Sequence, residues 1–100
     1  MVASTLFALS PPRFAHGRLL ITPGVRALIQ ETRLNVLPYL HRHLQGDWGD
    51  LCDADRRAND AALCNGDRLL SSYAVSPTQK LWIITEYDRS VTTLLLPDEY

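Results

Sequence analysis

Hydrophobic positions in the first third of the chain recur with the spacing of a helix. They follow the dipeptide Thr22-Pro23 and share one face of the helical period: Val25, Leu28, Ile29 and, at its edge, Thr32. The Thr22 hydroxyl can cap such a helix, and Pro23 suits its first turn because it has no N–H to leave unpaired. The pattern predicts a helix from Pro23 to about Arg33, after a short strand over residues 18–21.

Two more helices are indicated before residue 66. The first has an apolar stripe of Leu37, Leu40, His41 and Leu44, with Asn35 as its cap and Gly46 as its stop. Residues 53–64 are rich in aspartate and alanine and precede Asn65-Gly66, a common helix end. The alanines of this third helix share one face, so we expect that face to lie close to a sheet or to another helix.

The last third of the chain changes to β-branched and aromatic residues separated by short turns. This composition predicts strands over residues 68–76, 80–88 and 90–97. Short connections make them an antiparallel meander, to which residues 18–21 can add. The predicted fold is α+β: an antiparallel sheet of three to four strands with about three helices packed on one face, in the order β-α-α-α-β-β-β. Apolar residues on both faces of the strand over 80–88 predict a central position.

The length of the chain, 100 residues, corresponds to one domain. The tripeptide Ser-Pro-Pro at residues 10–12 is a break that separates the preceding segment from the rest of the chain. We therefore expect an N-terminal arm over residues 1–13 and a single α+β domain over residues 14–100. The apolar patch at residues 6–9 is too short for a signal peptide and has no basic residue before it. We therefore expect a cytoplasmic protein with Cys52 and Cys64 as free thiols.

Composition narrows the function without naming it. A hydrophobic fraction of 46% and a charged fraction of 21% are those of a globular protein rather than a disordered one. The net charge of −1 argues against a large basic face, so direct nucleic-acid binding is not expected. The same balance argues against a strongly acidic DNA mimic, although a local patch of charge remains compatible with it.

The stretch from Gln45 to Asp60 places five aspartates around Trp48 and has two interpretations. In the first, Gly46 and Gly49 shape a turn, Asp50 or Asp53 caps the third helix, and the tryptophan packs on the core. In the second, the stretch is an exposed protein-binding loop with the tryptophan as its anchor. A calcium loop is disfavoured because the alternating aspartate pattern and the glutamate at its twelfth position are missing.

The spacing of the residues does not favour a zinc site, a hydrolase site or a nucleotide-binding site. His41, His43, Cys52 and Cys64 lack the spacing of a zinc site. The chain has no nucleophile elbow, no P-loop and no dinucleotide-binding glycine motif. We assign no catalytic residue, no metal ligand and no cofactor on this basis.

Several segments together are similar to a known family. They are "GDWGDL", "RLLSSY" and "WIITEYDRSVTTLLLP", and the likeness extends over about residues 14–100. The chain resembles small bacterial proteins of plasmids, phages and other mobile elements, some of them labelled as type I restriction-related. That family has no established activity, so the resemblance implies a genetic setting. Proteins of this size on mobile elements often act by binding a host protein.

Two functional hypotheses follow. The first is a non-enzymatic binding protein of a mobile element that occludes a protein partner, with a nuclease-containing defence complex as the candidate partner and an anti-CRISPR or antirestriction role. Its expected partner-binding residues are exposed ones in the central loop and the next helix: Trp48, Asp47, Asp50, Arg56 and Arg57. The alternative is a small metal-dependent hydrolase or nuclease that uses Asp47, Asp50 and Glu86. An exposed edge strand also leaves a homodimer open.

Overall fold

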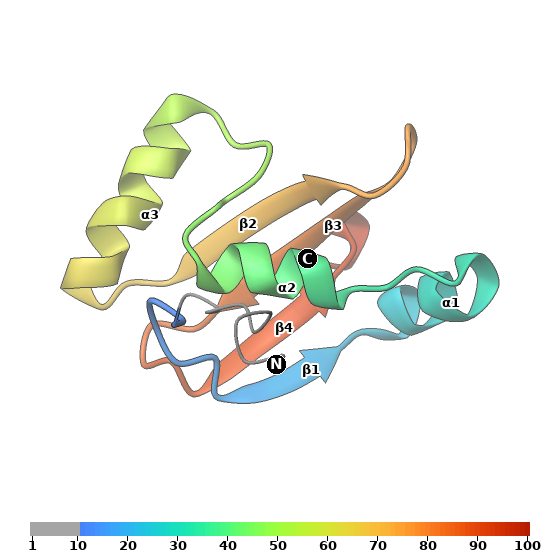
Figure 1. Cartoon of the computed structure of the whole chain (residues 1–100), viewed down its shortest axis with the longest axis horizontal. Coiled ribbons are helices and arrows are strands. Elements are labelled where there is room, and N and C mark those ends of the chain that lie inside the picture. The colour runs from blue at the N-terminus through green and yellow to red at the C-terminus, as the bar shows by residue number, and fades with distance from the viewer. Residues whose placement is uncertain (1–10) are drawn as a thin grey trace, which may run out of the picture.

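A computed structural model describes residues 11–100 and has the predicted α+β fold and element order (Figure 1). The elements are β1 (Arg18–Ile21), α1 (Pro23–Thr32), α2 (Leu37–Leu44), α3 (Asp53–Asn65), β2 (Leu69–Ala74), β3 (Lys80–Thr85), β4 (Val91–Leu95) and a final 3₁₀ turn, η2 (Pro97–Glu99). Most of the expected N-terminal arm, residues 1–10, lies outside the described residues. None of the helices in residues 11–100 is long and apolar enough to cross a membrane.

The sheet is mixed, with the strand order β1-β4-β3-β2. As predicted, β3 is central and pairs antiparallel with both β2 and β4. The expectation of a fully antiparallel sheet is wrong, because β1 runs parallel to β4, with Arg18 opposite Val91 and Ile21 opposite Leu94. Tight turns force consecutive strands to be antiparallel, whereas all three helices lie between β1 and β4 along the chain, and that long connection permits either direction.

One face of the sheet, the inner face, is covered by α2, which lies across it in Figure 1. The core joins side chains of this face to residues of α1 and α2: Val25, Leu40, Leu44, Tyr73, Leu81, Ile83 and Leu94. In Figure 1, α1 projects beyond the end of β1, and α3 stands beside β2. Because α3 lies at the edge of the sheet, its alanine face is not buried as predicted, and only Ala62 is buried among those alanines.

The helix ends show where local sequence rules hold and where they fail. Thr22 caps α1 as predicted, and its hydroxyl accepts a hydrogen bond from the Val25 N–H. The expectation that Asp50 or Asp53 caps α3 is wrong, because the cap residue is Cys52 and no side chain caps that end. Asp53 is instead the first helical residue, where its charge still complements the helix dipole.

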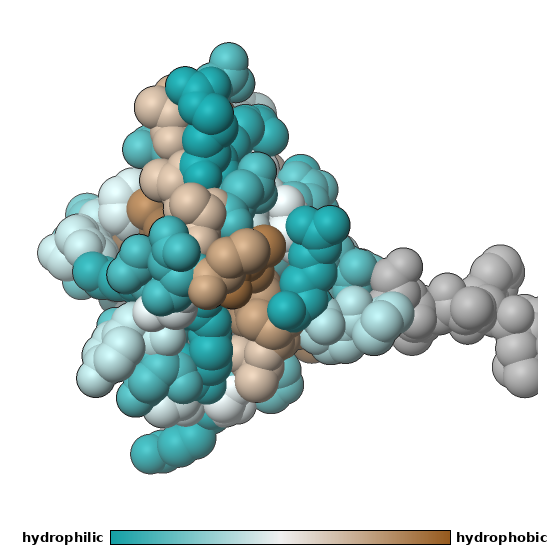
Figure 2. All heavy atoms as spheres, turned by 90° about the vertical axis from the view of Figure 1, so that its left-hand side faces the viewer, coloured by the Kyte–Doolittle hydropathy of each residue, from teal (hydrophilic) through white to brown (hydrophobic). Residues whose placement is uncertain are grey.

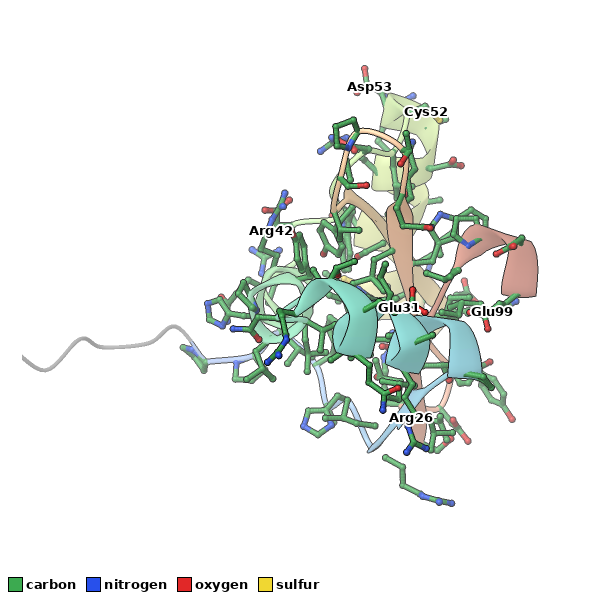
Figure 3. The ribbon with its side chains drawn as sticks, turned by 90° about the vertical axis from the view of Figure 1, so that its right-hand side faces the viewer. Arg26, Glu31, Arg42, Cys52, Asp53 and Glu99 are labelled. Carbon is green, nitrogen blue, oxygen red and sulfur yellow. The ribbon has the colours of Figure 1, made fainter. Side chains whose placement is uncertain are left out.

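The C-terminal turn fastens itself to the start of α1. The Glu99 carboxylate accepts hydrogen bonds from the Gly24 N–H and the Leu96 N–H, each at 2.9 Å, and from the Thr22 hydroxyl. Figure 3 shows Glu99 beside the first turn of that helix. These hydrogen bonds, led by that of the hydroxyl, hold the pKa of Glu99 below its ordinary value. One side chain therefore links the C-terminal turn to the start of α1.

Candidate partner-binding groove

The central loop, residues 45–52, runs along the outer edge of β2. The Ser72 N–H donates to the Trp48 carbonyl at 3.1 Å, and the Asp50 N–H donates to the Ser72 carbonyl at 2.6 Å. Gly49 lies between them with φ +77°, and a β-carbon there would collide with the Ser72 carbonyl and the Tyr73 ring. Only glycine permits this close approach of two backbones at positive φ. The loop therefore acts as a short extra strand that covers the β2 edge.

Asn59 of α3 covers the same edge one step further along. Its side-chain amide donates to the Leu70 carbonyl at 2.6 Å, and its oxygen accepts from the Leu70 N–H at 3.2 Å. The side chain thus replaces the pair of hydrogen bonds that a neighbouring strand would make. Together, the loop and this amide occupy the outward-facing backbone groups of Leu70 and Ser72.

Trp48 is buried, with 2% of its surface exposed. Its indole N–H donates to the Asp60 carboxylate at 2.9 Å, and its ring packs with Ala62, Leu69 and Phe14. The expectation that Trp48 is an exposed loop residue is therefore wrong, and the interpretation in which it packs on the core is confirmed. On this side of the molecule, Figure 2 shows a small hydrophobic patch surrounded by hydrophilic side chains.

Two of the other expected partner-binding residues hold the loop in shape. The Asp47 carboxylate accepts two hydrogen bonds from the Arg42 guanidinium, at 2.7 and 3.2 Å. This pairing is the main reason why the pKa of Asp47 lies below its ordinary value. The Arg56 guanidinium donates to the carbonyls of Gly49 and Leu51. Since the Asp47–Arg42 pair is about half exposed, it contributes at most about 1 kcal/mol to stability.

The remaining two expected residues, Asp50 and Arg57, are exposed. Asp50 borders a groove of about 350 Å³ on the second face of the sheet, the face that α2 does not cover. The groove is lined by Asp50, Leu51, Asp55, Leu70, Ser72, Lys80, Trp82 and Pro97. Arg57 is not among its lining residues. The structure thus brings one expected site residue, Asp50, together with several that the sequence did not indicate.

The groove combines an apolar floor with separated charges. Leu70 and the partly buried Trp82 form the floor, while Asp50 and Asp55 come from the loop and the first turn of α3. Neither carboxylate makes a side-chain hydrogen bond or salt bridge within the described residues. Figure 3 shows Asp53 at the same end of α3, projecting away from the sheet. Such a site suits a ligand that offers an apolar group flanked by positive charge.

The C-terminal residue closes one side of Trp82. The ring of Tyr100 packs edge-on against the indole, with 5.6 Å between ring centres, and the Arg68 guanidinium lies 5.2 Å from the Tyr100 ring centre. Trp82 therefore contacts Tyr100 and also lines the groove. A second cavity, of about 180 Å³ between α1 and the β2–β3 turn, has no charged side chain in its lining.

The alternative metal site is not formed. Asp47 is paired with Arg42, and Glu86 lies 3.9 Å from Arg68, beyond the end of β3. Glu86 is four residues along the strand from Trp82, a separation of roughly 13 Å. Within residues 11–100, no three histidine, cysteine or acidic side chains are placed to hold a metal ion. The hypothesis of three converging carboxylates is therefore wrong.

His43 is a buried residue whose role the sequence did not reveal. Its two ring nitrogens lie 2.6 Å from the Ser71 hydroxyl and 2.9 Å from the Thr85 hydroxyl, and the ring is fully buried. Burial, with a smaller effect of Arg89, lowers its pKa to about 3. The Ser71–His43 pair has the composition of a nucleophile and a base, but a ring sealed from solvent has no access to substrate. The signal for this role in the sequence was the presence of hydroxyl residues, Ser71 and Thr85, on strands that were predicted to be buried. A buried hydroxyl group requires a hydrogen-bond partner.

No family model, curated protein or solved structure matches this chain. The function is therefore argued from the groove and from the contacts around it.

Proposed function

We propose that this protein is a non-enzymatic binding protein of a mobile element, which acts by occluding a protein partner at the groove on the second face of the sheet. The observation that carries the proposal is the partly buried Trp82, which contacts Tyr100 and lines a groove together with two carboxylates that have no salt-bridge partner among residues 11–100. Aromatic side chains in such half-open positions are the usual anchors of protein interfaces.

The charge of the groove indicates the partner's chemistry. Asp50 and Asp55 line the groove, with Asp53 between them along the chain, and all three are exposed. Lys80 also lines the groove, so acidic side chains predominate there without being the only charges. A surface that binds nucleic acid is basic, so it complements this segment and would be blocked by it. Together with the resemblance to mobile-element proteins, this supports a nuclease-containing defence complex as the partner, in an anti-CRISPR or antirestriction role. The two exposed free cysteines, Cys52 and Cys64, fit a cytoplasmic setting.

The test measures whether this protein protects incoming phage DNA from a bacterial defence system. Cells that carry a type I restriction or CRISPR system are challenged with phage while they express the wild-type chain, the groove variant Asp50→Lys/Asp55→Lys or the matched control Glu31→Lys/Asp67→Lys. All four positions are exposed, and the control carries the same change of charge away from the groove lining. We expect the wild type and the control to protect the phage DNA, and we expect the groove variant to lose this protection.

A pull-down with the same three proteins separates specific capture from background. The partner is a protein retained by the wild type and the control but lost by the groove variant. Equal retention by all three chains, or equal protection by all three in the phage assay, contradicts the role of the groove. No protection in any defence system contradicts the proposed inhibitory function.

A further inference from the structure

The two edges of the sheet differ in whether another segment of the chain pairs with them. Along the β2 edge, the central loop and Asn59 pair with the outward-facing backbone groups. Along the β1 edge, no strand or bridge of the described residues pairs with the outer side of β1. An open edge strand is a template for a further strand, and natural proteins usually protect it with lysine, proline or a bulge.

Within Arg18–Ile21 the β1 edge has no lysine, proline or bulge, and its protection is limited to the shortness of the strand and the charge of Arg18. The N–H groups of Arg18 and Thr22 point inward and donate to Ser90 and Leu94 at the side of β4. By alternation, the N–H and C=O groups of Leu19 and Ile21 point outward. The three apolar side chains of β1, those of Leu19, Leu20 and Ile21, are 46%, 42% and 46% exposed. Within residues 11–100, nothing pairs with the outward backbone groups of this strand, and its apolar side chains are exposed.

We propose that two copies of this protein form a dimer by antiparallel pairing of β1 with β1. The residues with outward backbone groups must face one another in such a pair. With Leu20 opposite Leu20 on the twofold axis, Leu19 faces Ile21 of the second copy and exchanges both backbone hydrogen bonds with it. Arg18 then faces Thr22, so no like charges are opposed.

The neighbouring registers are less favourable. A shift in one direction places Leu19 opposite Pro23, which has no N–H to donate. A shift in the other direction places Arg18 opposite Leu20 and Gly17 opposite Ile21, and leaves only Leu19 facing an apolar residue of the second copy. The register with Leu20 on the axis is therefore the one that brings all three exposed apolar residues of each copy against apolar residues of the other.

The difference between the open β1 edge and the covered β2 edge favours a second copy of this chain as the partner of β1. An isologous contact at the β1 edge closes on itself, and the covered β2 edge stops further growth of the sheet. The result is one continuous sheet across two chains rather than a fibre. The pairing is short, so the buried area is small and we expect a dissociation constant in the micromolar range or weaker.

Sedimentation velocity of the full chain over a wide concentration range tests the pairing. We expect a reversible monomer–dimer equilibrium whose dissociation constant rises by about tenfold or more in Leu20→Lys, because like charges then oppose each other on the axis. The matched control is Leu37→Lys, since Leu37 is also apolar, lies on α2 and is 65% exposed. The control should dimerise as the wild type does, and circular dichroism verifies that both variants are folded.

A cross-link tests the register independently of the charge variant. In a background of Cys52→Ser/Cys64→Ser, the variant Leu20→Cys should form a disulfide-linked dimer under mild oxidation. Directly opposed side chains in a pair without mutual backbone hydrogen bonds approach disulfide distance. A monomer at every concentration, a dimer indifferent to Leu20→Lys, or a folded Leu20→Cys chain that does not cross-link would each overturn the proposal.

Discussion

The two tryptophans of this protein lie in opposite environments. Trp48 is 2% exposed, its N–H is bonded to Asp60, and its ring contacts His43 and Phe14 edge-on and face-on. Trp82 is only partly buried, packs against Tyr100 and lines a groove. Near Trp48, the side chains of Asp47, Arg56 and Asp60 all have intramolecular partners, whereas the carboxylates that line the groove beside Trp82 make no salt bridge within residues 11–100.

The two tryptophans look alike in the sequence but differ in their surroundings: Trp48 is part of the core, whereas Trp82 lies at the surface. "GDWGDL" has the composition of an interface loop, yet its tryptophan belongs to the core. "KLWIIT" reads as a plain strand, yet its tryptophan faces the groove. The difference arises because the loop pairs with β2 and folds inward, while Trp82 lies on the face of the sheet opposite α2 and lines the groove there. Composition alone therefore places the wrong tryptophan at the surface.

Replacement of the two tryptophans by alanine gives the largest expected difference. Trp48→Ala should lower the free energy of unfolding by about 3–5 kcal/mol because it empties a fully packed site. Trp82→Ala should lower it by about 1–2 kcal/mol because part of the ring is already in solvent. Urea denaturation measures both values. If the two losses are equal, the assignment of one tryptophan to the core and the other to the surface fails.

Two glycines sharpen the role of the loop. Gly49 and Gly66 both have positive φ, but a β-carbon at Gly66 meets nothing within 4 Å, whereas one at Gly49 meets the backbone of β2 and lies 2.7 Å from the Tyr73 ring. Gly66→Ala should cost about 1 kcal/mol of stability from strain alone. Gly49→Ala should cost about 2–3 kcal/mol, because the collision adds to the strain. Equal melting temperatures for the two variants would mean that the loop does not press on β2.

The third and smallest expected effect is the pH dependence set by His43, beside Trp48. The unfolded chain protonates this imidazole near pH 6.5, whereas the folded protein does so only near pH 3. Because the folded pKa is the lower one, its contribution is complete above pH 6.5 and is lost as the pH falls toward 3. We expect a loss of about 1.5–2 kcal/mol between pH 6.5 and pH 5.

Urea denaturation at a series of pH values measures this loss, and His41→Gln is the control because His41 is exposed. The carboxylates with lowered pKa values, those of Asp47, Asp88 and Glu99, titrate below this window. A wild type equally stable at pH 6.5 and pH 5 would show that His43 is not buried in its neutral form.

Much of the fold follows from local rules in the sequence. Thr22-Pro23 marks the start of α1, Gly66 ends α3 with φ +73°, and the turns of the meander fix the antiparallel pairs. The direction of β1 does not follow, because it depends on a partner some 70 residues away that no local pattern encodes. The third helix was placed correctly along the chain but not in space, since its alanine face suggested burial and its buried contacts are made by Asn59 and Ala62.

The site was less accessible to sequence reasoning. Asp50 was indicated because exposed aspartates near an aromatic residue suggest an interface, and it does border the groove. Trp82, Lys80 and Pro97 were not indicated, because a groove is made by segments distant in sequence. Arg56 was expected to face a partner, yet the nearest acceptors are backbone carbonyls of its own loop. Charged residues with intramolecular partners cannot be told from free ones without the fold.

The parallel pairing of β1 with β4 has a consequence for how the chain is made. Residues 18–21 leave the ribosome well before residues 91–94, the strand beside which they lie. The helices and the hairpins can begin to order during translation, whereas this last pairing must wait. The nascent chain therefore carries an unpaired apolar segment until residues 91–94 have emerged, and that is the interval in which a chaperone would have the most to protect.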